Sequence, residues 1–212
     1  LLAEDTAALE RLDSFRQGFA ENMQQQLQTM WAAKLGLAEF NPQLFNQLIQ
    51  LMSQSEVDYT IFFRELSTVP DNIEPLKKSF YKDSERGMPS IHSSYERDLN
   101  GMDKRWTAWL TKWNSYIRNG STANANTTSP NSREGLSMQM KLVNPKYSLR
   151  EWFVVPAYQQ AALGNYALIE ELQEVMTQPY AEQSKDVEDK FYRLKPLEFY
   201  NTGGISHYSC SS

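Results

Sequence analysis

The chain has 212 residues and a mass of 24.5 kDa, with 41% apolar and 12% aromatic residues, so it can bury a core without a disulfide or a bound metal. Its formal net charge of −5 is spread over both signs without a basic block, which argues against a nucleic-acid partner. One cysteine excludes an intrachain disulfide, and two histidines argue against a zinc site. No segment has the roughly 20 apolar residues that span a bilayer, so we expect no membrane association.

The first predicted element is a long amphipathic helix over residues 4–34. Its apolar side chains recur every three or four residues and therefore share one side of the helix. They are Leu9, Leu12, Phe15, Phe19, Met23, Leu27 and Met30. Gly36 is a stop signal for this helix. Because the chain begins at Leu1 without an initiating Met or a signal-peptide core, we expect it to be a piece of a longer polypeptide.

Two shorter helices are predicted next. Asn41 followed by Pro42 has the pattern of an N-cap and a first-turn proline, and the residues behind them form an apolar face. Ser55 with Asp58 resembles a capping box that opens a third helix, which ends before Pro70. Each of these helices therefore has a recognisable start.

The third helix also carries Asp58, Tyr59 and Arg64. An acid and an arginine on a short helix can brace neighbouring elements, and we favour this structural role over a contact with substrate. Prolines and a glycine break residues 71–97 into short pieces, with one helix expected over residues 74–82.

Residues 99–117 are predicted to form a helix with an aromatic side. Its apolar side chains are Met102, Trp106, Trp109, Leu110, Trp113 and Ile117. Tryptophans at helical spacing are typical of a buried core, and we prefer this interpretation to a ligand-stacking platform or a membrane interface. The polar side mixes both signs of charge, unlike the basic face of a membrane-binding helix.

The sequence between this helix and the next is polar. Residues 119–133, NGSTANANTTSPNSR, contain almost nothing that can be buried and are predicted to be a flexible loop or linker. Pro156 is a candidate kink in one of the helices that follow. These helices are expected over residues 134–142, 148–163 and 167–176.

The last segment is charged and then aromatic, and its rings would dock it on the preceding helices. These rings are Phe191, Tyr192, Phe199, Tyr200 and Tyr208. No segment alternates in the manner of a strand, so we predict an all-α fold. We divide it into a helical part (1–118), a linker (119–133) and a second helical part with the tail (134–212).

The only cysteine, Cys210, lies close to the end of the sequence. Such a thiol is either reactive and presented to a partner, or an accident of composition. His207 is near enough in sequence to lower the pKa of the thiol or act as its base, although two neighbours on a loose tail need share no fixed geometry. Gly203-Gly204 lacks the residues that complete a phosphate loop. Cys210 is therefore the one candidate site residue, with no catalytic, cofactor-binding or metal-binding residue identified.

The chain also carries a series of short motifs. They are AKLGL at 33–37, DYT at 58–60, FRELS at 63–67, VNPKYSLREW at 143–152, a Gly-Asn turn at 164–165, QPY at 178–180 and SCSS at 209–212. In this order they resemble the selenoprotein O family, also called YdiU or UPF0061, over nearly the whole chain. The departures are residues 71–133, which carry no motif, and residues 193–199, where many members have a Pro-Pro-Asp-Trp type of sequence.

This resemblance implies a protein-kinase-like fold that uses ATP and Mg²⁺ (or Mn²⁺) to transfer AMP to Ser, Thr or Tyr of protein substrates. The family's nucleotide and metal residues lie in a kinase-like core upstream of Leu1, so no cofactor is implied for these residues. The chain would be the helical C-terminal region of a protein adenylyltransferase pseudokinase, non-catalytic by itself. It would support the core and present Cys210 as a redox position, where some members have selenocysteine.

A second interpretation is a non-enzymatic helical module that binds a protein partner. A contiguous exposed apolar patch would favour either this module or docking to the upstream core. In the first interpretation the longer polypeptide is an enzyme and this chain alone is not, whereas in the second neither is. Members of the family occur in bacteria and in mitochondria, and we expect the bacterial cytoplasm.

Overall fold

The computed structural model describes residues 6–81, 99–120 and 132–199. The α-helices are α1 (Thr6–Lys34), α2 (Pro42–Ser55), α3 (Tyr59–Leu66), α4 (Leu99–Gly120), α5 (Arg133–Val143), α6 (Glu151–Ala162), α7 (Ala167–Thr177) and α8 (Lys185–Phe191). Two 3-10 helices are η1 (Pro75–Ser79) and η3 (Leu197–Phe199). In the described ranges there is no strand, only an isolated bridge between Val57 and Phe80. The predicted all-α fold is confirmed.

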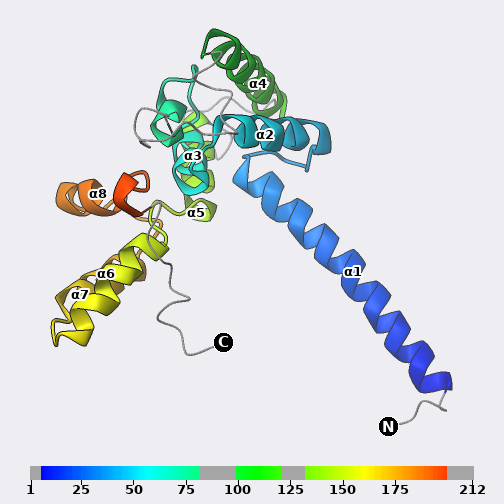
Figure 1. The fold of residues 1–212 in the computed structure, drawn as a ribbon. Helices are drawn as coiled ribbons and strands as arrows, with labels where there is room; N and C mark the ends of the chain where they lie inside the picture. The colour runs from blue at the N-terminus through cyan, green and yellow to red at the C-terminus, as the bar shows by residue number, and fades with distance from the viewer. Residues whose placement is uncertain (1–5, 82–98, 121–131, 200–212) are drawn as a thin grey trace.

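Helix α1 projects from the rest of the molecule as a long rod (Figure 1). Its 29 residues give it a length of about 43 Å. Its buried residues, Ala32 and Lys34, both lie in the last turn. The helix stops at Gly36, whose φ of 64° is a left-handed conformation that glycine adopts without strain. The predicted helix and its stop signal are confirmed.

The end of α1 is held by α5. A Cβ at Gly36 would lie 2.6 Å from the Met140 sulfur, so α5 approaches the backbone closely at this point. Asn144, which follows α5, is fully buried, and its amide donates to the Lys34 carbonyl at 2.9 Å and to the Ser67 hydroxyl at 2.9 Å. These contacts fix the angle at which α1 leaves the body.

The larger hydrophobic core, which we call core 1, lies where α2, α3, η1 and α4 pack together. Its fully or almost fully buried members include Leu35, Leu44, Leu48, Phe62, Phe63, Leu66, Leu76, Phe80, Met102, Trp106, Trp113 and Met140. Apart from Met140 of α5, they all come from residues 35–117. The segment from the end of α1 to the end of α4 therefore folds around one apolar centre.

The tryptophans of α4 form the middle of core 1, as the sequence predicts. Trp106, Trp109 and Trp113 expose 0%, 3% and 0% of their surface. Their indole N–H groups donate, in that order, to the Ser55 hydroxyl at 2.8 Å and to the carbonyls of Leu44 at 3.1 Å and Leu35 at 2.8 Å. Each ring is thus buried without leaving a donor unpaired, which would cost about 1–3 kcal/mol.

The start of α2 is as predicted, but that of α3 is not. The Asn41 side chain caps α2 by accepting from a backbone N–H at 2.9 Å. The predicted pairing of Ser55 with Asp58 is wrong, because Asp58 alone caps α3 by accepting from Ile61 N at 3.0 Å. Ser55 is instead the last residue of α2, where its hydroxyl accepts the hydrogen bond from the indole N–H of Trp106.

Several predicted boundaries also change. The helix expected over 74–82 is only the short η1, and the helix expected over 148–163 is α6, which begins at Glu151 and contains Pro156. Helix α4 runs to Gly120 and α5 begins at Arg133, so both ends of the predicted loop at 119–133 are helical. Its middle, residues 121–131, lies outside the described residues.

A second, smaller core, core 2, is formed by the later helices. Its buried members are Tyr147, Trp152, Phe153, Ala157, Leu172, Val175 and Phe191, with Tyr192 and Phe199 packed against it. The docking predicted for these last three rings is confirmed, whereas Tyr200 and Tyr208 lie outside the described residues. The two cores adjoin between Met140 and Tyr147. The three-part division of the chain stays a prediction.

Candidate functional site

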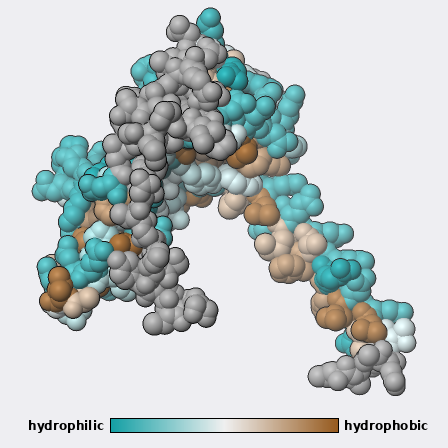
Figure 2. All heavy atoms as spheres, viewed as in Figure 1, coloured by the Kyte–Doolittle hydropathy of each residue, from teal (hydrophilic) through white to brown (hydrophobic). Residues whose placement is uncertain are grey.

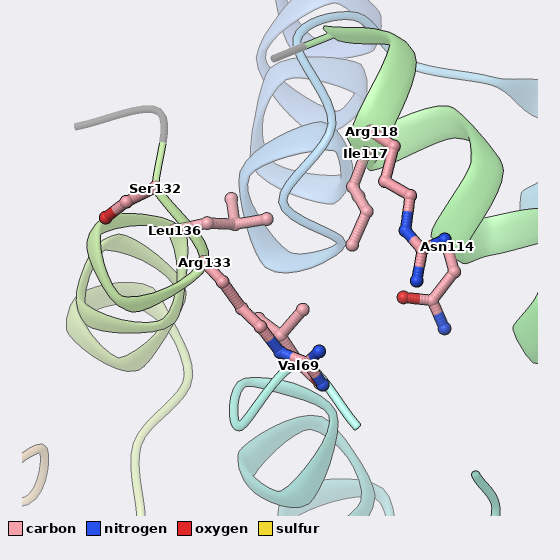
Figure 3. A pocket seen from close by; sticks show the side chains of 7 residues that line it. All are labelled: Val69, Asn114, Ile117, Arg118, Ser132, Arg133 and Leu136. Atoms are coloured by element: carbon pink, nitrogen blue, oxygen red, sulfur yellow. The ribbon is translucent and has the colours of Figure 1, made fainter. Parts of the chain in front are cut away.

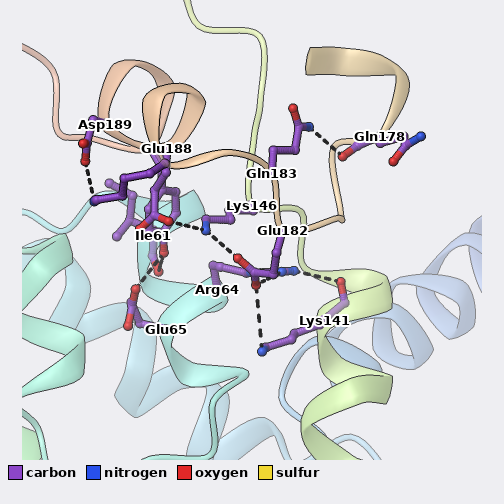
Figure 4. A network of polar contacts seen from close by, with 12 residues as sticks. Ile61, Arg64, Glu65, Lys141, Lys146, Gln178, Glu182, Gln183, Glu188 and Asp189 are labelled. Atoms are coloured by element: carbon purple, nitrogen blue, oxygen red, sulfur yellow. Dashed lines mark hydrogen bonds and ion pairs between the residues drawn. The ribbon is translucent and has the colours of Figure 1, made fainter. Parts of the chain in front are cut away.

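Buried charges join the two cores (Figure 4). Arg64 of α3 donates to the carbonyls of Lys141 at 3.2 Å and Asn144 at 3.1 Å, and to one Glu182 carboxylate oxygen at 2.6 Å. The other Glu182 oxygen accepts from Lys146. The side chains of Arg64 and Lys146 are only 5% and 6% exposed. Because a buried charge is costly unless it is paired, Glu182 between two cations holds the junction together.

The backbone places Lys146 and Glu182 beside each other. After α5 the chain passes Pro179, whose carbonyl accepts from the N–H groups of Lys146 at 2.8 Å and Tyr147 at 3.0 Å. Gln183 then donates its side-chain amide to the Val175 carbonyl at 3.0 Å, which ties the turn to the end of α7. The turn after α7 is thereby fixed against the segment after α5.

These pairings set the protonation states at the junction. Burial by itself would raise the pKa of Glu182, but hydrogen bonds and charges from Lys146 and Arg64 lower it from 4.5 to about 2. Burial would lower the pKa of Lys146, yet Glu182 and Glu188 raise it above its usual 10.5. A carboxylate with so low a pKa is a poor general base near neutral pH. The chemistry of this network is therefore electrostatic bracing.

A second ion pair links α3 to the start of α6. Asp58, with 3% of its side chain exposed, accepts from both terminal nitrogens of Arg150, one of them at 2.9 Å. It also accepts from the Tyr81 hydroxyl at 3.2 Å, in addition to capping α3. Burial would lower the pKa of Arg150, but Asp58 raises it. Such a bidentate pair fixes both distance and orientation between two elements.

A third contact ties the segment after α8 to α3. The Tyr192 hydroxyl donates to a Glu65 carboxylate oxygen at 3.0 Å, and Lys78 lies 3.2 Å from both oxygens. Burial and then the Glu65 charge raise the pKa of Tyr192. The phenol therefore stays protonated and continues to donate to Glu65.

A pocket of about 200 Å³ lies between α4 and α5 (Figure 3). Arg118 and Arg133 line it and share Asp71, whose carboxylate is 3.8 Å from the first and 2.8 Å from the second. Arg133 also donates to the Val69 carbonyl. The hydrogen bond from Arg133 lowers the pKa of Asp71. Asp71 therefore neutralises one of the two positive charges that line the pocket.

Lys34 is a buried cation with a different environment. Its amino group lies 4.9 Å from the ring centre of Phe63 and 5.3 Å from that of Tyr59. Burial lowers its pKa below 10.5. Within the described ranges it forms no ion pair, so cation–π contacts compensate its charge.

The residues singled out in the sequence fall into two groups, the candidate site with its neighbour and the expected bracing residues. Cys210 and its neighbour His207 lie outside the described residues. Asp58 and Arg64 are brought to the junction of the cores, and their predicted bracing role is confirmed. Sequence reasoning missed Glu182 as the partner of Arg64 and Arg150 as the partner of Asp58, because no local pattern gives a signal for either.

Two of the short motifs meet in space at this junction. Arg64 lies in FRELS at 63–67, and Lys146 lies in VNPKYSLREW at 143–152. Glu182 bridges these two residues. The motifs therefore build one shared structural feature.

Two further kinds of feature are absent from the residues that the structure describes. None of the helices there is long and apolar enough to cross a membrane. No group of three or more His, Cys, Asp or Glu in the same ranges could hold a metal ion.

The fold and the network define an all-helical protein whose two cores are joined by paired, buried charges. The sequence model of the family described as protein adenylyltransferase SelO matches residues 2–178. The chain belongs to this family.

Curated relatives agree with this assignment. The chain is 32% identical over 201 residues to a protein of Tolumonas auensis named protein nucleotidyltransferase YdiU, and 32% identical over 209 residues to a protein of the same name in Aromatoleum aromaticum. These alignments cover 92% and 96% of the chain but 34% and 35% of the relatives. A Flavobacterium johnsoniae protein of that name is 29% identical over the whole chain and 37% of its own length. The chain thus spans about a third of the length of the relatives it matches.

Proposed function

We propose that these residues are the helical accessory region of a protein adenylyltransferase. The complete protein would transfer AMP from ATP to Ser, Thr or Tyr of protein substrates through a kinase-like core of the pseudokinase type. The observation that carries this proposal is the family match over residues 2–178, combined with alignments that cover only about a third of each relative. In this proposal the catalytic core lies in the remaining two thirds.

The charge network supports a structural role for this region. A site for the ATP phosphates needs cations that remain available to the ligand. Arg64 and Lys146 are buried, Arg150 is 16% exposed, and all three are already paired with carboxylates. We therefore assign ATP and Mg²⁺ (or Mn²⁺) to the complete protein and to no residue of this chain. The region would keep the core in place.

We also propose Cys210 as a redox position, which rests on the resemblance of SCSS at 209–212 to the family's ending. Its thiolate would attack a glutathione disulfide, forming one S–S bond while the other glutathione leaves as a thiolate. A second cysteine of the complete protein could then displace the bound glutathione. Cys210→Ser in the complete protein should remove the oxidant-dependent shift on a non-reducing gel, and a shift that persists would contradict this role.

A second candidate is a non-enzymatic module that binds a protein partner. The apolar side chains of α1 are exposed, as an interaction surface would be. Both proposals place the protein in the bacterial cytoplasm, in line with the bacterial relatives.

The two candidates are separated by an AMP-transfer assay. The complete polypeptide and this 212-residue chain would each be incubated with ATP labelled at the α-phosphate, Mg²⁺ and a protein acceptor. We expect labelled acceptor only with the complete polypeptide. Labelling by the chain alone would contradict the accessory role, and no labelling by either would favour the binding module.

A further inference from the structure

The exposed side of α1 is the largest unexplained feature of the molecule. Large apolar side chains follow one another along it at steps of three or four residues, over about 32 Å of helix. The apolar stripe consists of Leu9, Leu12, Phe15, Phe19, Met23, Leu27 and Met30, which are between 42% and 74% exposed. Figure 2 shows apolar residues along α1, outside the body formed by the other helices. Contiguous exposed apolar surface of this kind marks an interaction site.

A lone helix of this composition also needs a partner to be stable. Isolated helices are marginal in water, and most helical stability in proteins comes from packing of an apolar face. Gly18 lies inside α1, where it disfavours the helix by about 1 kcal/mol relative to alanine. The present contacts of α1 bury only Ala32 and Lys34. A partner along the apolar stripe would supply the missing stabilisation.

The polar residues beside the apolar stripe narrow the choice of partner. Between Phe15 and Met30 they are mostly uncharged, and they include Gln17, Asn22, Gln24, Gln25, Gln26, Gln28 and Thr29. Paired helices of two chains are usually specified by charges flanking the seam, and membrane-binding helices carry Lys or Arg on the polar face. Between Gln17 and Met30, α1 has one charged residue, Glu21, and no Lys or Arg. This composition suits a helix enclosed within a protein body.

We infer that the apolar stripe of α1 packs against a helical face of the rest of the same polypeptide. This inference rests on the proposed function, in which about two thirds of the protein lies outside this chain. The family match begins at residue 2, so α1 belongs to the shared family architecture. Steps of three and four residues keep the seam nearly straight, which matches a long helix crossing at about 20°. Phe15 and Phe19, 74% and 67% exposed, are the aromatic anchors.

Hydrogen exchange followed by mass spectrometry tests this inference. We expect amides of residues 9–30 to exchange at least tenfold more slowly in the complete polypeptide than in this 212-residue chain. In the complete polypeptide, Phe15→Gln with Phe19→Gln should remove that protection. The matched control, Gln17→Ala with Gln25→Ala on the polar side, should retain it.

Other outcomes identify a different occupant or separate this inference from the proposed function. Equal exchange in both proteins would overturn the inference, as would a dimer of the 212-residue chain with a protected α1. Protection that appears only with anionic lipid vesicles would overturn it too. AMP transfer without protection of α1 would leave the proposed function standing and this inference refuted. Protection of α1 without AMP transfer would support this inference and refute the proposed function.

Discussion

Helices α1 and α4 have the same periodicity and opposite environments. Both place large apolar residues at steps of three or four along one side. In α4 this side is buried, and Trp106 and Trp113 have no exposed surface. In α1 it is open, with Phe15 and Phe19 mostly exposed. A periodic apolar face therefore predicts that a helix has a partner, but not that the partner lies in the same piece of chain.

The polar sides of the two helices differ in a way that fits these environments. The outer side of α4 carries Lys112 and Arg105, which donate to Gln47 and Gln54 of α2. In α1 the polar side is charged up to Arg16 and carries mainly amide side chains from Gln17 to Thr29. Charged side chains suit a face that stays in water, whereas amides suit a face that is partly enclosed.

The largest effect should come from the centre of core 1. Trp106→Ala removes a fully buried ring and leaves the Ser55 hydroxyl without its partner. We expect the free energy of unfolding, measured with urea, to fall by about 3–5 kcal/mol. Tyr166→Ala, at a side chain that is 57% exposed, is the control and should change little. Similar small losses for both would mean that core 1 is not packed as described.

The next largest effect should come from the junction of the two cores. Asp58→Ala removes the cap of α3 and leaves Arg150, whose side chain is only 16% exposed, without its carboxylate partner, so the free energy of unfolding should fall by about 3 kcal/mol. Asp58→Asn keeps the cap while removing the charge. Equal losses for the two variants in urea unfolding would show that the ion pair, and not the cap, dominates.

These first two sites also show what the sequence can and cannot predict. The burial of Trp106 follows from helical spacing alone, and the bracing role of Asp58 and Arg64 follows from their place on a short apolar helix. The partner of Arg64 could not be found in this way, because Glu182 lies 118 residues away. Local patterns specify helices and faces, whereas ion-pair partners depend on how distant segments pack. The exposure of α1 escaped prediction for the same reason.

A smaller effect is expected where α1 joins the body. Gly36→Ala would place a methyl group 2.6 Å from the Met140 sulfur at a left-handed φ, and we expect a loss of about 1–2 kcal/mol. Gly164→Ala is a matched control, because Gly164 also has a positive φ, 82°, but no atom lies within 4 Å of the place its methyl group would take. The difference between the two in urea unfolding measures the contact between α1 and α5. A zero difference would mean that α1 is loosely attached.

The pH dependence of stability sharpens the comparison for the junction. The pKa of Glu182 is about 2 in the folded protein, against an ordinary value of 4.5. Its ion pairs therefore add to the free energy of unfolding above pH 4.5, and this contribution is lost as the pH falls toward 2. Because its side chain is 58% exposed, we expect at most about 1 kcal/mol. Urea midpoints at pH 5 and pH 3 should differ less in Glu182→Gln than in the unaltered chain. If the midpoints of Glu182→Gln differed between the two pH values as much as those of the unaltered chain, another carboxylate would cause the loss of stability at low pH.

The smallest effect should be found on α1, where the comparison with α4 is most direct. Phe19→Gln replaces an aromatic ring that is 67% exposed, so the unfolding free energy of the 212-residue chain should change by less than about 0.5 kcal/mol. Trp113→Gln, near the middle of α4, should lower the unfolding free energy several times more, because that ring is fully buried. Urea unfolding followed by circular dichroism measures both. If Phe19→Gln were as destabilising as Trp113→Gln, the apolar stripe would already be packed within these residues, and the contrast between the two helices would disappear.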